Sequence, residues 1–436
     1  MTPPSTPEAR EGKGPPPSRN PFRRYLAILG PGLVTGAADD DPSGITTYSV
    51  AGASLGYAML WTAGFTFPLM AAVQLVCARI GLVSGRGLSG ALRDHYPRGV
   101  LYAACVLLLV ANVFNIGADL SGMADAVAML TGRSSPFVVL LFGVGIIVVT
   151  VYSKYRTFAR YLRWLTAVLL AYIAAAMLAR PHWGDVLWAT FLPSLRFDRD
   201  WMMTFVGILG TTISPYLFFW QASHEVEEEK AKGRTTLAER EGATPQELDD
   251  ARLDVVSGML FSNVVMYFII LTTAVTLHRV GHTNIASSRE AAEALRPLAG
   301  EAAAVLFALG IIGTGLLAIP ILAGSASYAV AELFKWRTGL DLRPWAGRRF
   351  YLVFSLAITV GIVMDLFGME PVRMLFLSAV LNGLLAPPLM ALVMLVGNNR
   401  KVMGKHANGF WLNLLGWGAT AVMTCAGVAL LLTGLR

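Results

Sequence analysis

Three consecutive carboxylates, Asp39, Asp40 and Asp41, stand inside an otherwise apolar stretch and are followed directly by Pro42. A carboxylate in the hydrocarbon region of a membrane is costly, so such residues face water or a cation. Proline breaks a helix because it lacks a backbone N–H and clashes one turn back. Asp41 directly precedes the break, so it is best placed to offer side-chain and main-chain oxygens to a cation. A water-filled break without a bound ion is the alternative.

A second apolar stretch, residues 209–221 (LGTTISPYLFFWQ), carries Pro215 near its middle. One proline in a membrane helix is often only a kink, but these two stretches are the first and sixth of the predicted spans. They therefore begin two five-span halves. Broken helices at matching places in two halves are typical of inverted-repeat transporters, whose substrate site lies between the repeats. Carbonyls freed from the helices can coordinate a cation there.

The donors at both breaks are side-chain or backbone oxygens, and neither break contains His, Cys or Met. Hard cations such as Mg²⁺ and Ca²⁺ prefer carboxylate and other oxygen ligands, whereas thioether and imidazole ligands select transition metals. The space opened by a glycine also leaves room for retained water, which suits Mg²⁺. The candidate metal-binding residues are Asp41, Ala38, Gly44, Thr211, Ser214, Asp40 and Tyr216.

The composition indicates a membrane protein, because the 436 residues are 55% hydrophobic and only 14% charged. A helix of about 20 apolar residues spans a bilayer, and backbone in lipid must be hydrogen-bonded within the helix. We predict an all-α membrane protein with 11 transmembrane helices, in which helices 1 and 6 are interrupted. The predicted spans are 25–52, 57–82, 99–118, 136–153, 161–179, 203–222, 255–277, 301–331, 350–366, 372–397 and 409–433.

Lys and Arg concentrate in the connections that share the side of the N-terminus, and such residues favour the cytoplasm. The sequence therefore predicts a multi-pass protein of the cell membrane with a cytoplasmic N-terminus and an extracytoplasmic C-terminus. Residues 1–22 are polar and Pro-rich, which is typical of a disordered tail. The transporter core is expected over 23–397, as inverted five-helix repeats of about 25–180 and 203–397. Residues 398–436 add helix 11.

Several segments resemble motifs of the Nramp divalent-metal transporters. GPGLVTGAADDDPSG (30–44) resembles the first-helix motif, in which Gly-Pro precedes Asp-Pro-Gly-Asn at the same spacing. GTTISPYLFFWQ (210–221) is similar to the sixth-helix motif, RIGLVSGRGLSGALRDHYPRG (79–99) to the connection between helices two and three, and GSASYAVAE (324–332) to the eighth helix. The resemblance covers nearly the whole chain from about residue 25 and implies the inverted-repeat fold.

The resemblance also implies that Asp41 is the family's metal-binding aspartate. The family's asparagine falls on Gly44, which enlarges the site, and its metal-binding methionine falls on Ser214. Losing a thioether removes the soft ligand that favours Mn²⁺ or Fe²⁺ over Mg²⁺. Both changes resemble the Nramp-related magnesium transporters, a side branch of the family.

Other departures concern proton transfer. The family's two helix-six histidines fall on Tyr216 and Gln221, and the acidic relay position of helix three falls on Gly122, although Asp125 is close by. These losses leave no obvious proton path. The resemblance therefore implies facilitative Mg²⁺ uptake by alternating access, without proton coupling.

Two other functions remain open. One is a proton-coupled Mn²⁺ symporter in which the aspartate triplet supplies proton carriers, and the other is a sodium-coupled permease for small organic solutes on the same fold. No nucleotide-binding glycine loop, catalytic triad or HExxH motif is present, so no enzymatic activity is expected. The expected partners are the transported divalent ion and the lipid bilayer, with no nucleic acid and no cofactor, and the chain is expected to be a monomer.

Overall fold

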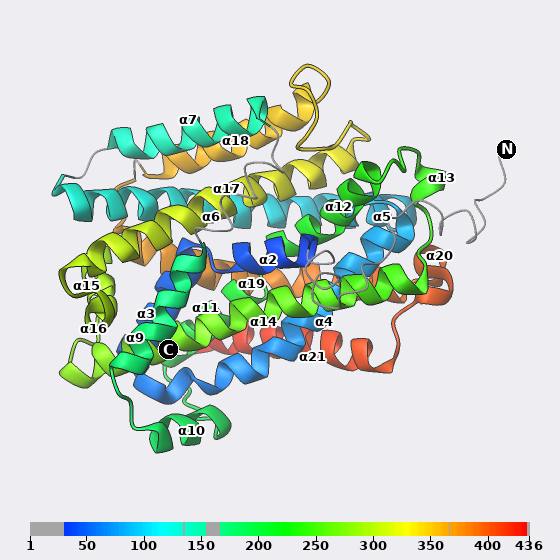
Figure 1. The fold of residues 1–436 in the computed structure, drawn as a ribbon. Helices are drawn as coiled ribbons and strands as arrows, with labels where there is room; N and C mark the ends of the chain where they lie inside the picture. The colour runs from blue at the N-terminus through cyan, green and yellow to red at the C-terminus, as the bar shows by residue number, and fades with distance from the viewer. Residues whose placement is uncertain (1–29, 134–135, 154–165, 366, 434–436) are drawn as a thin grey trace, which may run out of the picture.

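The computed structural model describes residues 30–133, 136–153, 166–365 and 367–433, and every regular element in these ranges is helical (Figure 1). The predicted tail of residues 1–22 and the start of the first predicted span lie outside the described residues. The all-α fold class predicted from the sequence is confirmed for the described part of the chain.

Each predicted repeat begins with a pair of helices separated by a short break. The first half contains α2 (Pro31–Asp39), α3 (Pro42–Leu55), α4 (Trp61–Ser84), α5 (Leu88–His95), α6 (Arg98–Thr131), α7 (Pro136–Tyr152), α9 (Ala171–Leu178) and α10 (Trp183–Phe191). The second half contains α11 (Arg199–Thr212), α12 (Pro215–Ala231), α13 (Leu237–Arg240), α14 (Pro245–Thr276), α15 (Ser288–Ala292), α16 (Arg296–Ala299), α17 (Ala303–Leu333), α18 (Arg348–Asp365) and α19 (Pro371–Asn398). The chain continues with α20 (Arg400–Met403) and α21 (Phe410–Thr433).

Seven helical stretches in the described residues are long and apolar enough to cross a membrane. They are Trp61–Ser84, Arg98–Thr131, Arg199–Ala231, Pro245–Val280, Ser288–Leu333, Pro371–Asn398 and Phe410–Thr433. Two shorter apolar helices, Pro136–Tyr152 and Ala167–Leu178, accompany them. Helices overlap all eleven predicted spans. Because some of these helices are broken or short, the total of eleven membrane crossings stays a prediction. The chain is a multi-pass membrane protein.

The third predicted span ends too early. It was expected to stop at residue 118, but α6 continues to Thr131, where Gly132 ends it in the left-handed conformation with φ of 70°. The apolar run ends at Asp119 in the sequence, whereas the helix does not. Its polar side chains are buried against other helices and not exposed to lipid, so a charged residue did not mark its end.

The helices pack in pairs that relate the two halves. The broken pair α2 and α3 packs on α14, the second helix of the other half, and α12 correspondingly packs on α4. The third helices of the two halves, α6 and α17, pack on each other. Figure 1 shows α14 running the length of the molecule beside α2, with α7 and α18 along one outer edge. This reciprocal arrangement is the inverted repeat that the sequence predicted.

Glycines let α2 lie very close to α14. A Cβ atom added at Gly36 would stand 2.1 Å from the carbonyl oxygen of Gly258, and one added at Gly258 would stand 2.0 Å from that of Gly32. Small residues of this kind allow two membrane helices to approach backbone to backbone. The position of the first half-helix is therefore fixed by its contact with α14.

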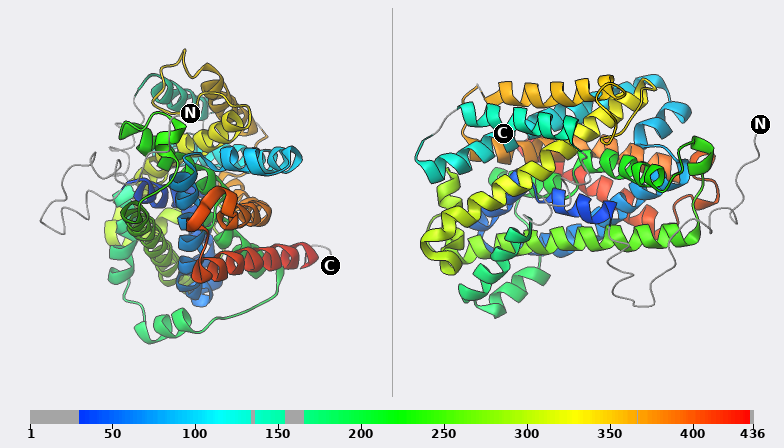
Figure 2. Two further views of the ribbon diagram at one scale, coloured as in Figure 1. Left: turned by 90° about the vertical axis from the view of Figure 1, so that its right-hand side faces the viewer. Right: turned by 45° about the horizontal axis from the view of Figure 1, so that its top comes forward.

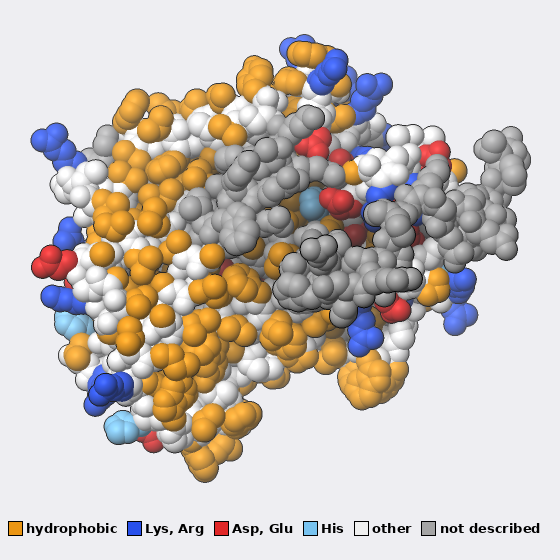
Figure 3. Space-filling view, viewed as in Figure 1, with side chains coloured by type: hydrophobic (Ala, Val, Ile, Leu, Met, Phe, Trp, Pro, Cys, Tyr) orange, Lys and Arg blue, Asp and Glu red, His pale blue; other side chains and the backbone are white. Residues whose placement is uncertain are grey.

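The surface agrees with a membrane location. In the face shown in Figure 3, apolar side chains cover the middle of the molecule and charged ones gather toward its two ends. Figure 2 (left) looks onto the end that carries α5, α13 and α20, which in Figure 1 lies at the right. We call this the α5 end, and the opposite end, near α15 and α16, the α15 end.

Candidate functional site

The first break is built around Asp41. Helix α2 ends at Asp39 and α3 begins at Pro42, whose missing N–H costs nothing at the first position of a helix. Asp41 is the N-cap of α3. Its Oδ1 atom accepts hydrogen bonds from the backbone N–H of Gly44 at 2.7 Å and from the hydroxyl of Ser43 at 2.8 Å. The side chain is 2% exposed, so a carboxylate is held inside the bundle at the point where the backbone unwinds.

The second break also has a polar N-cap residue followed by proline, but its N-cap side chain is a hydroxyl and not a carboxylate. Helix α11 ends at Thr212 and α12 begins at Pro215, with Ser214 as its N-cap. The Ser214 hydroxyl lies 2.8 Å from the carbonyl oxygen of Gly210 and 2.7 Å from that of Thr211, so it donates into the end of α11. Hydroxyl and carbonyl oxygens are thus concentrated where this second helix is interrupted.

The two breaks touch each other directly. The Tyr216 hydroxyl donates a hydrogen bond of 2.8 Å to the carbonyl of Ala38, and the Thr211 hydroxyl lies 3.1 Å from that of Tyr48. All four residues are buried. The structure therefore brings six of the seven predicted site residues to one pair of facing breaks: Asp41, Ala38, Gly44, Thr211, Ser214 and Tyr216.

Asp40, the seventh, is turned toward α14 together with Asp39. The hydroxyl of Ser262 lies 2.6 Å from Oδ2 of Asp39 and 3.2 Å from Oδ1 of Asp40. The other oxygen of each carboxylate is buried and has no hydrogen-bond partner among the described residues. The two aspartates thus form a separate carboxylate pair beside the site, on the face of α2 that packs against α14.

Helix α6 contributes two polar residues, and α19 a third, that the sequence reasoning did not place at the site. The Asn115 amide donates a hydrogen bond of 2.8 Å to Oδ2 of Asp41, and the Asn382 amide of α19 donates to Oδ1 of Asn115 at 3.2 Å. Asp119 lies one turn further along α6, fully buried near Asp41 and the backbone of Ser43. Polar residues four apart in an apolar helix share a face, and this spacing was the signal that could have revealed them.

The site gathers four carboxyl groups. Asp39, Asp40, Asp41 and Asp119 are all buried, and in the described part of the chain none forms an ion pair with Lys or Arg. Both carboxylate oxygens of Asp119 also lack a hydrogen-bond partner among the described residues. Buried carboxylates without a positive partner are costly, so this arrangement favours a bound cation.

A metal at this site would use mixed oxygen ligands. No group of three or more His, Cys, Asp or Glu side chains suited to a metal occurs within the residues that the structure describes. A cation beside Asp41 would therefore depend on one carboxylate together with hydroxyl, carbonyl and water oxygens. Such a set is typical of hard divalent ions that keep part of their hydration shell.

A polar layer closes the site toward the α5 end. The Thr35 hydroxyl donates to Oε1 of Gln221 at 2.5 Å, and the Gln221 amide donates to Oε1 of Glu225 at 2.9 Å. Beyond this layer the Asp254 carboxylate accepts the backbone N–H groups of Gly30 and Gly32 at the start of α2. Helix α2 is thus tied to both α12 and α14 on this side of Asp41.

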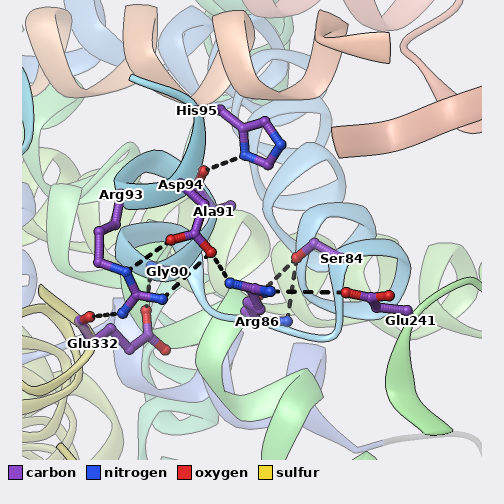
Figure 4. A network of polar contacts seen from close by, with 9 residues as sticks. All are labelled: Ser84, Arg86, Gly90, Ala91, Arg93, Asp94, His95, Glu241 and Glu332. Carbon is purple, nitrogen blue, oxygen red and sulfur yellow. Dashed lines mark hydrogen bonds and ion pairs between the residues drawn. The ribbon is translucent and has the colours of Figure 1, made fainter. Parts of the chain in front are cut away.

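Two of the segments singled out by the sequence meet at the α5 end (Figure 4). The Glu332 carboxylate, at the end of 324–332, accepts the backbone N–H of Gly90 at 2.9 Å, and the Arg93 side chain donates to the Glu332 carbonyl. Both partners belong to 79–99. Glu332 therefore caps the first turn of α5 from another helix and ties the connection after α4 to the end of α17.

Comparison with known proteins places the chain in a family. Residues 32–433 match the family model described as Natural resistance-associated macrophage protein-like, or Nramp. The chain is similar to proteins named divalent metal cation transporter MntH, with 27% identity to that of Brucella suis biovar 1 and 28% to that of Pectobacterium carotovorum subsp. carotovorum. These alignments cover 95% and 92% of this chain, and 90% and 92% of the respective relatives.

A solved structure shares the fold over nearly the whole length. The Eremococcus coleocola manganese transporter superposes with a TM-score of 0.74 at 17% identity, over 96% of this chain and 88% of that chain. At this identity the likeness concerns the fold alone. Together with the match of the family model to residues 32–433, it shows that the chain belongs to the Nramp family.

Proposed function

We propose that this protein carries a divalent metal ion across the membrane by alternating access, with Asp41 as the central ligand of the transported ion. The observation that carries the proposal is the Asp41 carboxylate, which is buried between two facing helix breaks without a Lys or Arg partner among the described residues. The names of the relatives, which are divalent metal cation and manganese transporters, support the same substrate class.

The contacts around Asp41 explain why access would have to alternate. Its oxygens, the Ala38 carbonyl and the hydroxyls of Thr211 and Ser214 bond to other protein groups in the described conformation. An ion gains these ligands when the two breaks separate or shift, and it leaves when protein hydrogen bonds replace it. The hydrogen bonds of α2 to Asp254 and Gln221 would keep the α5 end closed while the opposite side opens.

Two ions are candidates for the cargo. The relatives favour Mn²⁺, since their names describe manganese and divalent metal transport. The residues of this chain favour Mg²⁺, because Asp41 offers carboxylate oxygens and neither Ser214 nor Gly44 supplies a soft ligand.

The test is ion flux into liposomes that contain the purified protein, with Mg²⁺ and Mn²⁺ supplied separately and in competition. Asp41→Asn keeps the shape of the side chain and removes its charge, so we expect it to abolish flux of either ion. Asp125→Asn is the matched control, since Asp125 lies on α6 and accepts a hydrogen bond from the Ser288 backbone, away from the breaks. Full flux in Asp41→Asn, or no metal flux in the unaltered protein, would refute the proposal.

A pH-sensitive dye inside the same liposomes decides between the two coupling modes. Facilitative transport needs no proton, since a divalent ion gains about 4.6 kcal/mol per 100 mV of inside-negative potential. We expect Mg²⁺ flux that follows the membrane potential without internal acidification. Metal-dependent acidification would instead support the proton-coupled Mn²⁺ symporter, with the Asp39 and Asp40 pair beside the site as candidate proton carriers.

We further propose that the α5 end faces the cytoplasm, as the distribution of Lys and Arg predicts. In this orientation α5, α13 and α20 lie on the cytoplasmic side of a cell membrane. Labelling of an exposed cysteine placed at Glu239 of α13 in intact and opened cells tests the orientation. Labelling without opening the cells would reverse it.

A further inference from the structure

Asn115 lies at the centre of a buried chain of amides that ends on the proposed metal ligand. We infer that Asn115 is a positioning residue, which fixes the Asp41 carboxylate in the orientation that receives the ion. The inference rests on the proposed function in one respect only, namely that the cargo binds at Asp41.

The two oxygens of Asp41 are held in different ways. Oδ1 accepts hydrogen bonds from Ser43 and Gly44, which lie two and three residues further along the chain and move with Asp41. Oδ2 is held by Asn115, which stands on a different helix. The local contacts fix one oxygen relative to α3, whereas Asn115 fixes the other relative to α6. Of these contacts, only the one with Asn115 fixes the orientation of the carboxylate relative to the other helices.

Asn115 is itself held in place. Its Oδ1 atom accepts the Asn382 amide of α19 at 3.2 Å, which assigns its NH₂ group to Asp41. Both amides are buried, at 0% and 2% exposure, so water does not compete for these contacts. The chain Asn382–Asn115–Asp41 therefore links α19, α6 and the first break in a single direction of hydrogen-bond donation.

All three donors to Asp41 are N–H or O–H groups of neutral residues, and such donors favour a charged carboxylate without neutralising it. A basic residue in place of Asn115 would hold Asp41 equally well but would repel the arriving cation. An amide orients the ligand and leaves its charge available. This explains physically why an asparagine, and not Lys or Arg, would serve at this position.

Removal of the amide should weaken ion binding more than it slows the transport cycle. Asn115→Leu keeps the branched shape of the side chain and removes the donor, so we expect the KM for the transported ion to rise roughly 10- to 100-fold. The maximal rate should change much less, because a saturating ion still finds Asp41. Asn382→Leu should give a smaller rise in KM, since it frees Asn115 without removing it.

The chain offers a matched control on the same helix. Asn112 is also buried, and its amide donates to the Leu322 carbonyl at 2.8 Å and to the Ser325 hydroxyl at 2.6 Å, with no contact to Asp41. Asn112→Leu therefore removes a buried amide of equal size from α6. It should lower thermal stability at least as much as Asn115→Leu. The KM should stay within about twofold of that of the unaltered protein, because Asn112 and Asp41 share no hydrogen-bond partner and changes at such sites are nearly independent.

The experiment compares these variants in two assays, liposome flux as a function of ion concentration and the rise in melting temperature on adding Mg²⁺ or Mn²⁺. The inference predicts a raised KM and a reduced ion-induced rise in melting temperature for Asn115→Leu, a smaller change of both for Asn382→Leu, and neither change for Asn112→Leu. Equal effects in Asn112→Leu, or an unchanged KM in Asn115→Leu, would overturn it.

The proposed function and this inference fail separately. If the unaltered protein moves no metal, or if Asp41→Asn retains full flux, the proposed function fails before Asn115 is considered. If Asp41→Asn abolishes flux and Asn115→Leu behaves like Asn112→Leu, only the positioning role fails. Because KM is measured for whichever ion the protein carries, the result does not depend on the choice between Mg²⁺ and Mn²⁺.

Discussion

The carboxylate of Asp254 accepts a hydrogen bond of 2.6 Å from the backbone N–H of Gly32, although 222 residues separate them in the sequence. The same carboxylate also accepts the N–H groups of Gly30 at 2.9 Å and Leu33 at 3.1 Å. The first N–H groups of a helix need acceptors, and α2 begins after Gly30, which has no side chain to supply one. Asp254 therefore caps α2 from α14 and holds it closed at the α5 end.

Loss of this cap should open the α5 end. Asp254→Asn replaces an acceptor oxygen by an NH₂ group that faces backbone N–H groups. This should weaken the contact between α2 and α14 by about 1–3 kcal/mol of free energy. We expect faster labelling of a cysteine introduced at Ala37, a buried position on α2, in a chain that also carries Cys425→Ser. The control is Arg252→Gln, which alters an exposed residue of α14 near Asp254. Equal labelling rates in both variants would show that α2 does not depend on Asp254.

The close contact between α2 and α14 gives a second prediction. A methyl group at Gly36 would stand 2.1 Å from the Gly258 carbonyl, and a backbone atom cannot move aside as a flexible side chain can. Gly36→Ala should therefore push α2 away, lower stability by about 1–3 kcal/mol and reduce flux. Gly145→Ala on α7 meets nothing within 4 Å and should keep both properties. Thermal unfolding and liposome flux measure the two effects, and normal behaviour of Gly36→Ala would contradict the close packing.

The two breaks could be predicted from the sequence because proline acts locally. Pro42 and Pro215 each lack the N–H that a continuous helix needs, so the interruptions and the residues beside them are visible without any structure. Tertiary contacts carry no such signal. The sequence does not show that Asp254 caps α2 or that Asn115 reaches Asp41, because both contacts depend on how separate helices pack. Asp119 was not placed at the site because the predicted third span ended at residue 118, one position before it.

Ser214 gives a third prediction, which concerns selectivity. Its hydroxyl bonds to the carbonyls at the end of α11, so this position offers only oxygen to the site. Ser214→Met introduces a soft thioether at the second break, and we expect the ratio of Mn²⁺ to Mg²⁺ flux to rise. Ser214→Leu adds similar bulk without sulfur, so it should reduce flux of both ions alike. Competition flux assays measure the ratio, and a similar ratio in both variants would show that position 214 does not contact the ion.

Asp119 gives a fourth prediction, in which stability and activity change in opposite directions. Its carboxylate is fully buried on α6, and neither oxygen finds a hydrogen-bond partner among the described residues. Burying a polar group without a partner costs about 1–3 kcal/mol in mutational data, and the nearby Asp41 charge adds repulsion. Asp119→Asn removes the acidic group at constant shape, so the melting temperature without added metal should rise.

The same change should reduce ion flux, because it removes an acidic group beside Asp41 that attracts a cation when it is ionised. Asp125→Asn on the same helix is the control. Asp125 is partly exposed and already accepts the Ser288 N–H at 3.2 Å, so its loss should not stabilise the protein. A lower melting temperature for Asp119→Asn would mean that its carboxylate has a stabilising partner. Unchanged flux together with a higher melting temperature would mean that Asp119 lies beside the ion path without acting on the ion.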